Sequence, residues 1–99
     1  MLQNRLPEQP SHIIIYFTAK WCGPCNSLAL DRLVAQHTHV VWYICDVDEE
    51  TYVPGYCGVK TIPSFLGIVQ GKPTPLHSGS DIVGIAKWML QYMTVPRRT

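Results

Sequence analysis

The chain has 99 residues, which suits one small domain with its own hydrophobic core. Apolar residues make up 46% of it and charged residues 15%, so the composition favours a folded protein over a disordered one. A formal net charge of +1 lacks the basic excess of a nucleic-acid-binding protein. No apolar run approaches the roughly 20 residues of a membrane span. We therefore expect neither nucleic acid nor a membrane as a partner.

Helical and strand patterns alternate along the sequence. The first predicted elements are a short helix over 2–8, a buried strand over 12–17, a helix over 25–36 and a second buried strand over 40–45. A short helix over 49–56, ended by Pro54 and Gly55, is followed by a hairpin of strands 64–70 and 74–77 that turns at 70–73. A last helix has a cap at Ser80 or a neighbour and carries residues 82, 85, 86, 89, 90 and 93 on one face. Strands separated by helices run parallel, and the hairpin adds antiparallel strands. The prediction is one α/β domain over 1–99, with a core over 12–93, a flexible tail over 94–99, and helices on both faces of a mixed sheet.

The four cysteines form one tight pair and two singles, which does not resemble a disulfide framework. The first eleven residues are polar and rich in proline, and leave no room for a secretory segment. We therefore expect a reducing compartment, the cytoplasm, with one special cysteine pair.

That pair is Cys22-Gly23-Pro24-Cys25, between a buried strand and a helix. A pair with this spacing is a redox couple, a structural disulfide or half of a zinc site. Zinc would need two more ligands from Cys45, Cys57 and four histidines, and no second tight pair exists, so we expect no metal. Redox chemistry is favoured because the unpaired N–H groups and dipole of a helix start stabilise a thiolate.

The two sulfurs are expected to differ. Cys22 is predicted to be exposed and to act as the nucleophile, and Cys25 to lie beneath the helix start and resolve the mixed disulfide. Pro24 has a backbone angle suited to the first helical turn, and Gly23 leaves the approach to Cys22 free of a side chain.

Residues Trp21-Cys22-Gly23-Pro24-Cys25 resemble the active-site motif of the thioredoxin family. The segments 17–21, 46–48 and 58–65 and Gly79 fit as well, so the resemblance covers roughly 13–93. It implies a thioredoxin fold with a central four-stranded mixed sheet, from which the family's first strand is missing. It also implies a cis peptide bond before Pro63 and a docking rim formed by Trp21, the loop containing Thr61 and Ile62, and Gly79.

The sequence departs from the family beneath the cysteine pair. Thioredoxins usually carry a buried Asp there, and this chain has Tyr16; a common Lys on the neighbouring strand is replaced by Ile44. A tyrosine is a poor base at neutral pH, so we expect slower resolution or a proton supplied by water. Cys57 resembles an additional cysteine of some animal thioredoxins and is either a regulatory thiol or an inert one.

The resemblance implies an enzyme, a thiol–disulfide oxidoreductase that reduces protein disulfides and so serves electron transport and cell redox homeostasis. No bound cofactor is expected, since the Cys22/Cys25 couple carries the electrons. These would come from an NADPH-linked flavoprotein of the thioredoxin-reductase type or from a small thiol, and we expect a monomer. The alternative is a binding or assembly module with this fold and little turnover.

Overall fold

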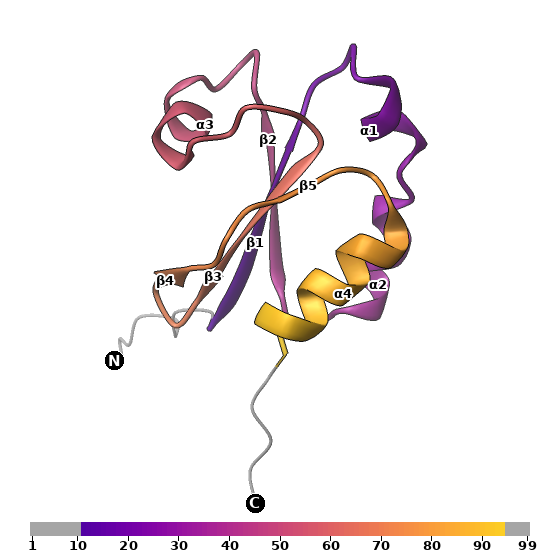
Figure 1. The fold of residues 1–99 in the computed structure, drawn as a ribbon, viewed down its shortest axis with the longest axis vertical. Coiled ribbons are helices and arrows are strands. Elements are labelled where there is room, and N and C mark those ends of the chain that lie inside the picture. The colour runs from indigo at the N-terminus through magenta and orange to yellow at the C-terminus, as the bar shows by residue number, and fades with distance from the viewer. Residues whose placement is uncertain (1–10, 95–99) are drawn as a thin grey trace, which may run out of the picture.

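The structure is a computed structural model that describes residues 11–94 (Figure 1). Its elements are, in chain order, β1 (His12–Thr18), α1 (Gly23–Ser27), α2 (Leu30–Gln36), β2 (Val41–Asp46), α3 (Tyr52–Cys57), β3 (Ser64–Val69), β4 (Lys72–Pro73), β5 (His77–Ser78) and α4 (Ile82–Tyr92). The helix expected over 2–8 and the tail beyond residue 94 lie outside the described residues.

The sheet is mixed, with strand order β2-β1-β3-β4 and with β5 also paired to β3. β1 runs parallel to β2 and antiparallel to β3, as the alternation of helices and strands predicted. The sheet is thus four strands wide, and β4 and β5 share its fourth position along β3.

The hairpin differs from the prediction in its second strand, which is divided in two. The turn is confirmed in place but is shorter than predicted: Gln70 and Gly71 form it, with φ angles of 52° and 82° as a tight two-residue hairpin turn requires, whereas Lys72 and Pro73 already belong to β4. After β4, Pro75 has no N–H to donate, and the ladder is interrupted. Thr74 continues the contact with β3, because its N–H donates to Gly67 O at 2.8 Å and its Oγ1 accepts from Gly67 N–H at 3.0 Å.

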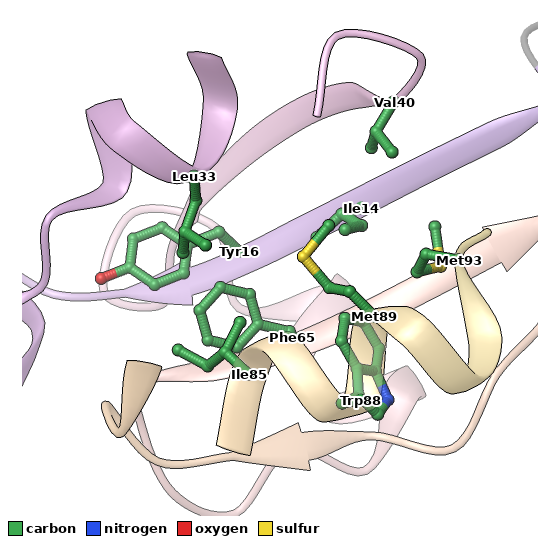
Figure 2. Close-up of a cluster of buried hydrophobic side chains, with 9 residues drawn as sticks. All are labelled: Ile14, Tyr16, Leu33, Val40, Phe65, Ile85, Trp88, Met89 and Met93. Carbon is green, nitrogen blue, oxygen red and sulfur yellow. The ribbon is translucent and has the colours of Figure 1, made fainter. Parts of the chain in front are cut away.

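Helices lie on both faces of the sheet, as expected. α2 and α4 pack on one face, and α3 lies on the other (Figure 1). Figure 2 shows the main core between the sheet, α2 and α4. Its buried members are Ile14, Tyr16, Leu33, Val40, Phe65, Ile85, Trp88, Met89 and Met93.

The face that α4 buries was predicted only in part. Ile85, Met89 and Met93 are buried as expected, whereas Ile82, Ala86 and Leu90 are exposed. Trp88 takes their place in the core, with its Nε1 donating to Pro75 O at 3.0 Å. A buried tryptophan needs such a partner for its N–H, and the loop between β4 and β5 supplies it. The N-cap of α4 is Asp81, a neighbour of Ser80. The Asp81 carboxylate accepts hydrogen bonds from the N–H groups of Val83 and Gly84.

The single helix predicted over 25–36 is two helices. Leu28 is extended, with φ −76° and ψ 130°, and separates α1 from α2 although no proline is present. Leu28 and Leu30 both pack against the main core. In a continuous helix, residues two positions apart do not share a face, so the break allows both leucines to reach the core.

Pro54 does not end α3, contrary to the prediction. It lies in the first turn of the helix, where its missing N–H costs no intrahelical hydrogen bond. The helix ends instead at Gly58, whose φ of 78° is the left-handed conformation typical of a glycine after a helix.

Candidate active site

The cysteine pair lies where the chain leaves β1 and enters α1. Cys22 is the N-cap of α1, and its Sγ accepts a hydrogen bond from Cys25 N–H at 3.1 Å. Pro24 lies in the first turn, where its lack of an N–H has no cost. A thiolate at Cys22 would therefore receive an N–H donor and the positive end of the helix, as the sequence predicted.

Cys22 and Cys25 are joined by a disulfide bond, with their Cα atoms 5.2 Å apart. The expectation that Cys22 is exposed is wrong for this oxidised state: the residue is 3% exposed, against 5% for Cys25. Ala19 forms a small buried cluster with both cysteines, and Val47 and Ile62 pack against it. Both cysteines therefore lie within this cluster in the oxidised state. At Gly23 an added Cβ would meet no atom within 4 Å, so the surface beside the pair is open at that residue.

Tyr16 lies beneath the pair, in the position expected for it. Its side chain is buried in the main core, and its hydroxyl donates to Cys25 O at 3.4 Å. Cys25 O also accepts from Leu28 N–H at 3.2 Å. Tyr16 therefore contacts the backbone of Cys25. Ile44 lies on the neighbouring strand, as expected, and is the register partner of Tyr16, but it is 66% exposed and so does not fill the space beneath the disulfide.

The segment containing Pro63 faces the cysteine pair through Ile62. The Ile62–Pro63 peptide bond is cis, as the resemblance implied. Gly79 N–H donates to Pro63 O at 2.9 Å, and the buried Ser64 Oγ donates to Thr61 O at 2.6 Å. These bonds fix the loop on both sides of the proline and connect it to Gly79, which has φ 118°.

A groove runs beside the disulfide between Trp21, α3 and the loop before β3. We call it the docking groove; it is lined by Trp21, Val47, Pro54, Val59, Lys60, Thr61 and Ile62. Sequence reasoning named Trp21 and the loop, but missed Val47 and Pro54. It also missed Asp48, whose Oδ2 accepts from Trp21 Nε1 at 2.6 Å. The sequence contained a signal for the involvement of Asp48 in the site, because this residue belongs to the 46–48 segment that resembles the family.

The other two cysteines lie away from the disulfide. Cys57 lines a separate apolar groove on the α3 face, with Ile15 and Leu66 from the sheet. Burial raises the pKa of the Cys45 thiol, and the charges of Glu50 and Asp46 raise it further.

The structure between residues 11 and 94 contains no group of three or more histidine, cysteine or acidic side chains that could hold a metal ion. No helix in the same range is long and apolar enough to cross a membrane.

A buried disulfide between two cysteines three positions apart at a helix start, on a mixed sheet with helices on both faces, defines a thiol–disulfide oxidoreductase domain. The family model described as Thioredoxin matches residues 2–91 of this chain. The chain belongs to the thioredoxin family.

Individual relatives show the same likeness. The chain is 34% identical over 90 residues to thioredoxin H-type 1 of Nicotiana tabacum, covering 89% of this chain and 68% of that protein. It is 33% identical over 82 residues to the TPR repeat-containing thioredoxin TDX of Oryza sativa subsp. japonica, covering 81% of this chain but only 26% of that longer protein. Mitochondrial thioredoxin 3 from Saccharomyces cerevisiae, in its oxidized form, matches with a TM-score of 0.79 at 28% identity over 84% of this chain and 80% of that one.

Proposed function

We propose that the protein reduces disulfide bonds in other proteins. The reduced Cys22 thiolate attacks one sulfur of the substrate disulfide, forms a mixed disulfide and releases the first substrate thiolate. Cys25 then attacks Cys22, which restores the disulfide seen here and releases the second substrate sulfur as a thiol. The observation that carries the proposal is the Cys22–Cys25 disulfide at the first turn of α1, with Cys25 N–H donating to Cys22 Sγ.

The docking groove supports a protein as the substrate. It is mostly apolar, Thr61 and Ile62 line it from the loop before β3, and Ile62 packs against the cluster that contains the disulfide. A substrate segment around a cystine can pair with the backbone of this loop as an added strand, while its side chains lie against Trp21. Gly79 supports the loop from behind through its bond to Pro63 O. All of these groups come from one chain, so one chain suffices for turnover and a monomer is competent.

The electrons that regenerate the dithiol come from outside the chain. We assign them to an NADPH-linked flavoprotein of the thioredoxin-reductase type, with a small thiol as the other source. We assign the protein to the cytoplasm, where reduced thiols are maintained. Because one relative named above is mitochondrial, fractionation of cells is the test of that assignment.

Insulin reduction tests the proposed activity. The protein should precipitate the insulin B chain with dithiothreitol as donor, and Cys22→Ser should be inactive. Cys45→Ser and Cys57→Ser are the matched controls and should retain activity. Activity in Cys22→Ser would overturn the proposal. Repeating the assay with NADPH and a thioredoxin reductase separates the two electron sources, since a purely thiol-driven protein would respond only to dithiothreitol.

One observation favours a binding module with little turnover, namely Tyr16 in place of a carboxylate near Cys25. A reductase has a defined reduction potential that follows an external redox buffer. Titration of the Cys22/Cys25 couple against such a buffer distinguishes the two functions, because a binding module needs no reversible potential.

A further inference from the structure

The docking groove is lined by one charged side chain, that of Lys60. Lys60 is exposed and lies in the loop before β3, two residues before Ile62. Ile62 packs against the buried cluster that contains Cys22 and Cys25. Two residues of chain span at most about 7 Å, so the backbone of Lys60 lies within that distance of Ile62. The Lys60 ammonium, on its flexible four-carbon stem, is therefore beside the surface that leads to the disulfide.

The acidic side chains on the other side of Trp21 are already engaged within the chain. They lie at the end of β2 and in the loop after it, and are Asp46, Asp48, Glu49 and Glu50. Trp21 Nε1 donates to Asp48 Oδ2, and Lys20 Nζ lies 3.5 Å from Glu49 Oε2. The other two carboxylates accept backbone N–H groups at 2.9 Å. Lys60 differs, because its ammonium forms no ion pair with any acid of residues 11–94.

We propose that Lys60 selects protein disulfides that carry an acidic side chain close to the attacked cysteine. This selection rests on the proposed reductase function and adds to it the chemistry of the preferred substrate. A substrate segment that lies along the loop before β3 brings its own side chains past Lys60. A carboxylate there forms a charge-assisted hydrogen bond with the ammonium, whereas a basic side chain is repelled.

The selection acts at the surface, so it is modest and depends on salt. A solvent-exposed ion pair changes an equilibrium by about threefold, and complementary charges act mainly on the rate of association. At about 1 M salt the Debye length falls to about 3 Å, and the preference should disappear. A preference that arises from the shape of the groove would remain at high salt.

Single-turnover reduction of model peptides tests the selection. The probe is a short peptide closed by an internal disulfide, made with Glu, Gln or Lys on both sides of each cysteine. These side chains also change the reactivity of the disulfide itself, so each rate constant for the prereduced protein is divided by that for dithiothreitol alone. The ratio should be about threefold higher for the Glu peptide than for the Gln peptide, and lower for the Lys peptide.

Substitutions of Lys60 assign the preference to this residue. Lys60→Glu should reverse the order of the Glu and Lys peptides, and Lys60→Gln should bring their ratios together. Lys60 is exposed, so neither change disturbs packing. Lys72→Glu is the matched control with the same change of charge. Lys72 pairs with Val69, at the opposite end of β3 from Ser64 and the docking groove, so this variant should keep the original order.

The outcomes separate this selection from the reductase function on which it rests. Equal ratios for the three peptides would overturn selection by Lys60, as would an order that survives Lys60→Glu or about 1 M salt. An equal response to Lys72→Glu would overturn it too, because net charge and not the groove would then be responsible. In all of these cases the peptides are still reduced, so the reductase function stands. If the unchanged protein reduces none of them, the reductase function is wrong and the selection falls with it.

Discussion

Trp21 Nε1 donates a hydrogen bond to Asp48 Oδ2 at 2.6 Å, which connects the residue before the cysteine pair to the loop after β2. Trp21 is 69% exposed and would otherwise be free to rotate at the protein surface. The bond holds the indole along one wall of the docking groove. We therefore expect Asp48 to act on the substrate through Trp21, as a positioning residue.

We expect Asp48→Ala to weaken substrate binding more than chemistry. Loss of one charge-assisted hydrogen bond at an exposed position costs about 1 kcal/mol, which corresponds to about a fivefold rise in KM for a protein disulfide. Because the indole loses its partner, its fluorescence should change as well. Asp31→Asn, an exposed acid in the first turn of α2, is the control. A fall in kcat with an unchanged KM would contradict a positioning role.

We expect Tyr16→Phe to reduce stability slightly and to leave turnover nearly unchanged. The hydroxyl donates only to Cys25 O, which keeps the N–H of Leu28 as a second donor. The free energy of unfolding should fall by about 0.5–1.5 kcal/mol, measured by urea denaturation. The pH profile of insulin reduction should keep its shape. A tenfold loss of kcat with a shifted profile would instead make Tyr16 the proton carrier.

We expect Cys25→Ser to accumulate a mixed disulfide between Cys22 and a substrate. The attacking thiol remains and the resolving thiol is gone, so the reaction stops after its first step. Mass spectrometry of the trapped species should locate the bond at Cys22. The same preparation from Cys22→Ser should trap nothing. A mixed disulfide at Cys57 in the trapped species would mean that Cys57, and not Cys22, makes the first attack, and would contradict the prediction.

A side chain at Gly67 on β3 is expected to force neighbouring side chains to move. An added Cβ there would collide with Met93 Sδ and approach two atoms of Thr74 at 3.0 Å. Gly67→Ala should lower the free energy of unfolding by about 1–3 kcal/mol, through overpacking. Gly55→Ala is the matched control, because its Cβ would meet no atom within 4 Å and a helix gains up to about 1 kcal/mol from the exchange. Urea denaturation of both variants should show changes of opposite sign.

Stability is expected to fall in mild acid through His37. Burial lowers the pKa of its imidazole, and the charge of His39 lowers it further. The unfolded chain binds a proton at this histidine near pH 6.5, whereas the folded protein resists protonation until a lower pH. The contribution is therefore complete above about pH 6.5 and is lost as the pH falls through the lowered pKa. His37→Gln should make the urea midpoint of unfolding depend less steeply on pH across this range. If the midpoint depends on pH as steeply as in the unchanged protein, the assignment to His37 is wrong.

The strands and the cysteine site could be read from the sequence because their signals are local. The β-branched runs before Cys22 and before Asp46 predict β1 and β2 on their own, and the place of the cysteine pair between a strand and a helix favours a redox couple. The break at Leu28 was missed because no proline or glycine marks it. It arises from the packing of Leu28 and Leu30 against the main core, which depends on residues far along the chain.

The misassigned face of α4 has a similar cause. Its sequence has apolar residues around much of the helix, so periodicity does not fix which of Ile82, Trp88 and Leu90 is buried. The acceptor for Trp88 Nε1 lies in the loop between β4 and β5, and that contact becomes visible only in the fold. The bond between Trp21 and Asp48 likewise joins segments separated by β2.

The break at Leu28 also separates the redox centre mechanically from the scaffold. α1 contains Cys25 and has Cys22 as its N-cap, but it shares no continuous hydrogen-bond ladder with α2, which contributes Leu33 to the main core. When the disulfide opens, we expect the short α1 turn to adjust its position through the backbone at Leu28 while α2 remains packed. Oxidised and reduced forms should then share one interior and differ at the surface that a partner meets.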